Sequence, residues 1–158
     1  MSDRELREHV AALIQWEDAH TGLDRIVEGI AVEQWGTTAT GFPHTLWQLL
    51  EHIRLAQHDI LDFCRNPAYA PLRWPDDYWP PPSARPSAAE VARSLASLGE
   101  DRQALVAMAL DPTVDLLARI PHGSGQSYLR ELLLVADHTS YHLGQMVDLR
   151  RALDIWPP

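Results

Sequence analysis

Two histidines four residues apart, His138 and His142, are the side chains in this sequence whose spacing best suits metal chemistry. They lie in ELLLVADHTSYHLGQMVDLRR, residues 131–151, where apolar residues recur with helical spacing. Residues four apart on a helix have Cβ atoms about 5–6 Å apart, so two imidazole nitrogens can converge on one metal ion. Two hydrogen-bonded histidines at the edge of a core would show the same spacing. The pair alone therefore leaves both interpretations open.

His52 is a third histidine that a helical pattern turns inward. The apolar stripe of its helix consists of Leu46, Leu49, Ile53, Ala56, Ile60 and Phe63. His52 lies at the edge of this stripe, whereas His58 lies on the opposite side among charged residues and is expected in solvent. Three neutral imidazoles leave coordination positions open for water or substrate, which is typical of a catalytic rather than a structural metal site. We therefore predict a divalent-metal site formed by His52, His138 and His142.

Other chemical motifs are missing from the sequence. Thr139 follows His138, so the HExxH motif of zinc proteases is not formed, and the GxSxG motif of serine hydrolases does not occur. The single cysteine, Cys64, excludes an internal disulfide and fits a reducing cytosol. The chain contains no lysine, which removes Schiff-base chemistry and the P-loop lysine. The ligand set does not identify the metal, because histidine suits Zn, Ni, Cu and Fe alike.

Length and charge limit the class of protein. With 158 residues, 46% of them hydrophobic and 22% charged, the chain is expected to form a single domain over residues 1–158. A net charge of −9 argues against nucleic-acid and anionic-membrane partners. No run approaches 18 apolar residues, and the first ten residues lack the apolar region of an export signal. We expect a cytoplasmic protein.

Four amphipathic patterns predict the helices that position the histidines. They span residues 3–30 with a break expected near Gly22, 45–65, 87–111 and 127–153. Thr45, Ser87 and Ser127 are suitable N-caps, and Ser87 forms a capping box with Glu90. Four such helices predict an all-α four-helix bundle, in which metal sites are built from side chains on facing helices.

A long segment, residues 66–86, separates the second and third predicted helices. It contains seven of the twelve prolines, which cannot continue a helix interior. It also contains Tyr69, Trp74, Tyr78 and Trp79, more aromatic mass than a disordered linker usually has. We expect a packed crossover, long enough to let these two helices run parallel in an up-down-down-up bundle.

Three residues break the apolar patterns. His20 replaces an apolar residue in the first stripe and is expected as a hydrogen-bonded core residue; that stripe comprises Leu6, Val10, Leu13, Trp16, Leu23, Val27 and Ile30. Arg102 interrupts the apolar stripe of the third helix and requires a negative partner. That partner is either Glu131 or an anionic group of a substrate or thiol, for which Arg73 is a second candidate holder. Trp47 is expected on the outer face of its helix, where an exposed aromatic residue favours a homodimer interface.

Three runs resemble the DinB-like (DinB/YfiT) superfamily of metal-dependent four-helix-bundle proteins: PHTLWQLLEHIRLAQHDIL, WPDDYWP and ADHTSYHLGQMVDLRR. The resemblance covers nearly the whole chain. It implies an up-down-down-up bundle, metal ligands at His52, His138 and His142, and frequent homodimers. Characterised members of this superfamily include S-transferases and isomerases that use the thiols mycothiol or bacillithiol. His20, His44 and His122 do not match the ligand positions.

Two functional hypotheses follow. In the first, the chain is an enzyme, such as a thiol S-transferase or hydrolase, in which a divalent metal (Zn, Ni or Fe) activates a low-molecular-weight thiol that attacks a small electrophile. In the second, it is a non-catalytic metal- or ligand-binding stress-response protein. Both have a small-molecule substrate or thiol as the partner, with no nucleic acid and no membrane. Thiol-dependent loss of an electrophile in an assay would separate them.

Overall fold

The fold is an all-helical bundle, seen in a computed structural model that describes residues 2–15 and 19–156. Its elements are α1 (Asp3–Gln15), α2 (Leu23–Val27), the 3-10 turn η1 (Val32–Gln34), α3 (Leu46–Arg65), the 3-10 turn η2 (Asp76–Tyr78), α4 (Ala88–Leu110) and α5 (Tyr128–Ala152). The described residues contain no strand. None of their helices is both long and apolar enough to cross a membrane. The predicted all-α class is confirmed.

The long helices begin where the sequence provides caps. The Thr45 hydroxyl accepts a hydrogen bond from the Gln48 backbone, and the Gln48 side chain accepts one from the Thr45 backbone. Ser87 and Glu90 form the predicted capping box of α4, and Ser127 caps α5. These bonds satisfy amide groups that have no partner within the helix. The predicted bounds of the last three helices are therefore confirmed to within about two residues.

The first predicted helix, by contrast, is divided. α1 ends at Gln15 and α2 begins after Gly22, so a break occurs near the expected position. α2 stops at Val27, shortly before Gly29, whose φ of 71° is easily adopted only by glycine. Leu13, predicted in the stripe, is 50% exposed, because the buried face of α1 consists of Arg7, Val10, Ala11 and Ile14. Trp16, also placed in that stripe, lies outside the described residues.

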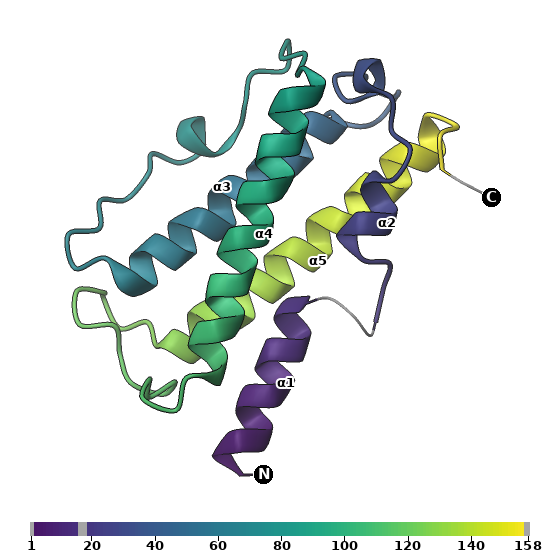
Figure 1. The fold of residues 1–158 in the computed structure, drawn as a ribbon. Coiled ribbons are helices and arrows are strands. Elements are labelled where there is room, and N and C mark those ends of the chain that lie inside the picture. The colour runs from purple at the N-terminus through teal and green to yellow at the C-terminus, as the bar shows by residue number, and fades with distance from the viewer. Residues whose placement is uncertain (1, 16–18, 157–158) are drawn as a thin grey trace.

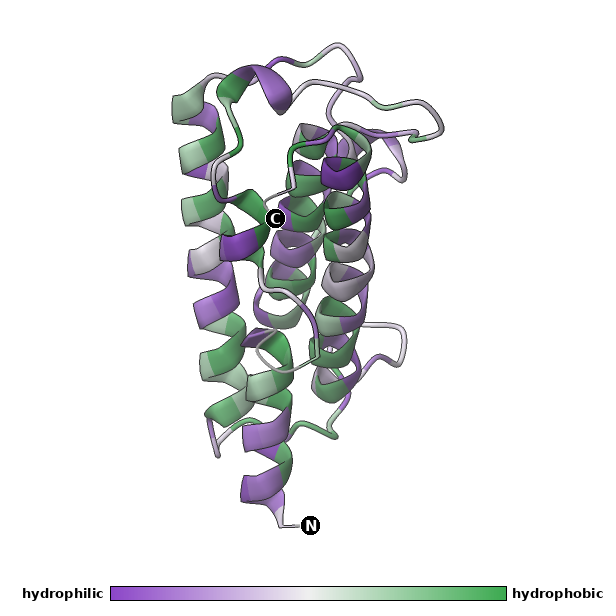
Figure 2. Cartoon of the chain, turned by 90° about the vertical axis from the view of Figure 1, so that its right-hand side faces the viewer, coloured by the Kyte–Doolittle hydropathy of each residue, from purple (hydrophilic) through white to green (hydrophobic). Residues whose placement is uncertain are grey.

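The helices enclose two apolar clusters. The first involves α2 and the neighbouring parts of α3, α4 and α5, and its buried members are Leu23, Ile26, Trp35, Leu46, Trp47, Leu49, Leu50, Ile53, Val91, Leu98, Leu143, Met146 and Leu149. The second involves α1 and the other ends of the same three helices, and its buried members are Val10, Ala11, Ile14, Ile60, Leu61, Cys64, Leu105, Met108, Ala109, Leu116, Ile120, Leu132 and Val135. Figure 2 shows apolar and polar positions alternating along the helices. On α5, His138 and His142 lie between the residues of the two clusters.

Trp47 belongs to the first cluster and is only 8% exposed, so its predicted outward position was wrong. The reason is that α3 packs against both α4 and α5, which buries a wider arc than one apolar stripe. Leu50, Gln57 and Leu61, all outside the predicted stripe, are buried for the same reason. Trp47 therefore gives no support to a homodimer interface.

The chain returns along the outside of the bundle between α3 and α4. In Figure 1 both helices run from the same end, and the connecting segment, residues 66–87, passes back beside α3. The 3-10 turn η2 in this segment contacts α3. This contact brings Tyr78 and Trp79 of the crossover beside His52 on α3.

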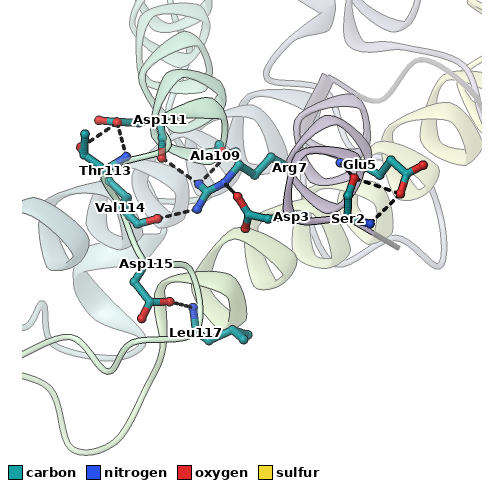
Figure 3. A network of polar contacts seen from close by, with 10 residues as sticks. All are labelled: Ser2, Asp3, Glu5, Arg7, Ala109, Asp111, Thr113, Val114, Asp115 and Leu117. Carbon is teal, nitrogen blue, oxygen red and sulfur yellow. Dashed lines mark hydrogen bonds and ion pairs between the residues drawn. The ribbon is translucent and has the colours of Figure 1, made fainter.

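Arg7 of α1 binds the chain at the C-terminal end of α4 (Figure 3). Its guanidinium is buried and donates to the carbonyl groups of Ala109 at 3.2 Å, Asp111 at 2.7 Å and Val114 at 2.8 Å. A fourth bond joins Arg7 Nε to the Asp3 carboxylate at 2.7 Å. The cation thus binds carbonyl groups at the C-terminal end of α4, which lack partners within the helix, and one carbonyl of the connection that follows it. We refer to these residues as the Arg7 cluster.

Candidate metal centre

The three predicted histidines meet in the interior. Their ring centroids are 4.5 to 4.8 Å apart, and one nitrogen of each ring lies within 4.8 Å of the others. The Nε2 atoms of His52 and His138 are 3.0 Å apart. A tetrahedral zinc ion with Zn–N bonds of about 2.0–2.1 Å separates its nitrogen ligands by about 3.3 Å. This group, the histidine cluster, could therefore hold a metal ion.

Hydrogen bonds orient two of the rings. His52 Nδ1 lies 3.1 Å from the carbonyl oxygen of Tyr78, which can only accept, so Nδ1 carries the proton. His142 Nδ1 lies 2.8 Å from Oε1 of Gln145 and donates in the same way. In each ring the Nε2 lone pair is then left for a metal ion. Partners of this kind fix the tautomer and the orientation of metal-binding histidines in proteins generally.

The crossover supplies the wall beside His52. The ring of Trp79 stacks on His52 with a centroid distance of 3.7 Å and an interplanar angle of 9°. Its other face stacks on His44 at 4.0 Å. The Tyr78 and Tyr69 hydroxyls both donate to the Asp59 carboxylate, at 2.7 and 2.9 Å. These contacts attach the crossover to α3 and hold the His52 ring in place.

Burial keeps the three imidazoles neutral. It lowers the pKa of His52 and of His138 to about 4, with a smaller contribution from the neighbouring histidine charges. Burial also lowers the pKa of His142. A histidine must be deprotonated to bind a metal ion. The cluster therefore offers three free bases at neutral pH.

A cavity of about 230 Å³ adjoins the cluster. It is lined by His52, Ala56, Asp59, Ile60, Trp74, Tyr78, Leu134 and His138, and we refer to it as the histidine cavity. Trp74 is 70% exposed, so it stands where the cavity meets solvent. A small molecule in this cavity would contact two of the three histidines.

The remaining histidines lie apart from the cluster. His20 is exposed and lies 3.0 Å from the Ser140 hydroxyl, so its predicted core position was wrong; it belongs to the connection between α1 and α2 rather than to a helix. His58 is exposed, as predicted, and its ring contacts Asp101 at 3.0 Å. His122 bonds to the Phe63 carbonyl at 2.7 Å. His44 stacks on Trp79, which in turn stacks on His52.

Neither candidate anion holder lines the histidine cavity. Arg102 is half-buried and lines a different cavity of about 720 Å³, between α4 and the connection from α1 to α2. Glu131, its expected partner, bonds to Arg130 at 2.7 Å on the other side of α5, so that pairing was wrong. Arg73 is exposed, and its guanidinium and backbone N–H together donate three hydrogen bonds to Asp77. Burial raises the pKa of Cys64 to about 12, so this thiol is protonated at neutral pH.

Several residues around the cluster were not predicted from the sequence. Gln145 and Asp59 could have been found by spacing, because Gln145 is three residues from His142 and Asp59 seven from His52, each on the same helix face. The role of the Tyr78 carbonyl could not have been found in this way, since every residue has a backbone carbonyl and the residue type does not indicate its partner. The stacking of Trp79 also depends on how the crossover folds.

A comparison with family models gives one match, in which the model described as the DinB superfamily covers residues 15–146. The matched range includes all three histidines. No curated protein and no solved structure gives a significant match to the chain.

Proposed function

The chain belongs to the DinB superfamily, and from this premise we propose that it is a metal-dependent enzyme. In this proposal His52, His138 and His142 hold a divalent ion. The substrate pair is a low-molecular-weight thiol and a small electrophile, and the product is a thioether or a related adduct. The thiol chemistry comes from the resemblance, and the donor set supports the metal.

The observation that carries the proposal is the cavity beside the histidine cluster. A purely structural zinc site is closed by four protein ligands and does not need an adjoining cavity. Here His52 and His138 both line a space of about 230 Å³, large enough for a small molecule. An ion held by three histidines would keep an open position facing that space.

The residues of the chain have separable roles in this proposal. A divalent ion, when bound, lowers the pKa of a thiol or water that it contacts. The Tyr78 carbonyl and Gln145 keep the protons of His52 and His142 on Nδ1, away from the ion. Trp74, Tyr78 and Leu134 exclude water from part of the cavity, which strengthens charge interactions inside it.

The test begins with metal analysis of protein purified without a nickel column. The metal-loaded protein is then given a thiol and an electrophile such as a chlorinated nitroarene, and loss of the electrophile is followed. We expect turnover that needs both metal and thiol, with His52→Ala inactive and His58→Ala active. Metal binding without turnover for any thiol tested would instead favour the non-catalytic alternative.

Two further properties remain proposals, namely a homodimer, which rests on the resemblance alone, and a cytoplasmic location, which rests on the single cysteine. Trp47 is buried and cannot mark an interface. Sedimentation at micromolar concentration tests the dimer, and a monomer there would contradict it.

A further inference from the structure

We propose that the histidine cavity selects a thiol that carries a positively charged amino group. The sulfur would lie toward the histidine cluster and the amino group toward Asp59. This inference rests on the function proposed above and adds the charge and the orientation of the thiol.

The walls of the cavity suit a cation, with a carboxylate at the end away from the histidines and two aromatic rings between, each with its centroid 6.1 to 6.4 Å from that of His52. Asp59 supplies a carboxylate whose two oxygens accept from Tyr78 and Tyr69, and each oxygen keeps a lone pair for a further donor. The rings of Trp74 and Tyr78 lie 5.5 Å apart at an angle of 56°. Aromatic faces attract ammonium groups, and a neighbouring carboxylate adds to this attraction.

The two ends of the cavity are separated along α3. His52 and Asp59 are seven residues apart, which places them about 10 Å apart along the helix axis. Tyr78 spans the same interval, because its carbonyl contacts His52 and its hydroxyl contacts Asp59. A ligand that fills the cavity must therefore be elongated, with a metal-binding atom at one end and a group that suits a carboxylate at the other.

The placement of the arginines argues against an anionic thiol. Among the described residues that line the histidine cavity there is no arginine. Arg130 lines a neighbouring cavity that shares Asp59, Ile60 and Leu134, but its guanidinium bonds to the buried Glu131. Arg102 lines the cavity on another side of α4. A carboxylate on the thiol would therefore face Asp59 without a matching cation.

The experiment uses three thiols of equal length that differ only in charge: aminohexanethiol, mercaptohexanol and mercaptohexanoate. Protein loaded with cobalt(II) is titrated with each, and the absorption of the cobalt centre reports binding of sulfur. We expect aminohexanethiol to bind about 10-fold to 100-fold more tightly than mercaptohexanoate, with mercaptohexanol between them, as for a charged hydrogen bond in a partly buried site.

Two variants test which residues cause the preference. Asp59→Asn keeps the size of the side chain and an acceptor oxygen, and should bring the three affinities within about 3-fold of one another. Asp62→Asn removes the same charge one turn further along α3, outside the residues that line the cavity, and should leave the preference intact. Should Asp59→Asn fail to fold, Trp74→Leu provides the test, because Trp74 is largely exposed and its loss should reduce the preference without unfolding the protein.

The outcomes distinguish the two levels of the proposal. Equal binding of the three thiols, or tighter binding of mercaptohexanoate, would overturn the cationic thiol and leave the metal-thiol function standing. A preference for aminohexanethiol that survives both Asp59→Asn and Trp74→Leu would also overturn it. If none of the thiols changes the cobalt absorption, the proposed function falls as well.

Discussion

The Arg7 cluster and the histidine cluster are both polar groups inside the bundle, but they differ in charge and in the number of hydrogen bonds that hold them. Arg7 brings donors to acceptors: three carbonyl groups and the Asp3 carboxylate receive its N–H groups (Figure 3). The histidine cluster brings three neutral imidazoles together, and one hydrogen bond of 3.0 Å joins Nε2 of His138 to Nε2 of His52. Several hydrogen bonds from one buried cation stabilise a fold strongly, whereas a single bond between two neutral rings contributes only about 0.5–1.5 kcal/mol. We infer that the first cluster holds the structure together and the second serves binding.

The largest expected effect is on metal affinity at the histidine cluster. Replacing His52, His138 or His142 by Ala should lower the affinity for zinc by roughly 1000-fold or more, since each supplies one of three ligands. His58→Ala, on the same helix as His52, should leave the affinity unchanged. Titration calorimetry measures both. An equal loss of zinc affinity for His52→Ala and His58→Ala would contradict the assignment of metal binding to the histidine cluster.

A smaller effect is expected on stability at the Arg7 cluster. Arg7→Ala strands several partly buried carbonyl groups and should lower the free energy of unfolding by about 3 kcal/mol, with zinc affinity unchanged. The matched control is Arg4→Ala on the same helix, where an exposed pair with Glu8 is lost and about 0.5 kcal/mol or less is expected. Urea denaturation of the metal-free protein measures both. A change in zinc affinity for Arg7→Ala would show that the two clusters are coupled.

The smallest effect is the pH dependence of stability. The pKa of His52 and of His138 is about 4 in the folded chain, below the ordinary value of 6.5 that the unfolded chain keeps. Between these values the unfolded chain binds protons that the folded chain does not, so the metal-free protein should lose stability as the pH falls from 7 to 5.5. The expected loss is roughly 1 kcal/mol or less for each histidine.

Denaturation at the two pH values measures this loss. His138→Gln should reduce the loss, while Arg7→Ala should show the wild-type loss, because an arginine does not titrate in this range. Stability that is independent of pH in this window would contradict the neutral state of the histidines.

The sequence predicts well those features that depend on side chains close to one another along the chain. The starts of α3, α4 and α5 follow from Thr45, Ser87 and Ser127, and the convergence of His52 with His138 and His142 follows from helix periodicity. These predictions need only residues within two turns of one another, together with the rule that apolar stripes face a shared core.

The predictions that failed depend on which elements are neighbours. Trp47 is buried because α3 is covered by two helices, and a stripe calculated for one helix cannot include the second. Glu131 pairs with Arg130 rather than Arg102, because α4, which carries Arg102, packs mainly against α1 and α3 and only slightly against α5. The cavity beside the histidines depends in the same way on where the crossover places Trp74 and Tyr78.

The distance along the chain between the proposed ligands links metal supply to folding. His52 and His138 are 86 residues apart, so an unfolded chain retains only the His138 and His142 pair as a local binding unit. An ion that prefers the folded chain stabilises it by mass action, by about 2.7 kcal/mol when its free concentration is 100 times the dissociation constant. The melting temperature would then rise with metal concentration. The fraction of chains surviving proteolysis would likewise depend on how much metal the surroundings provide.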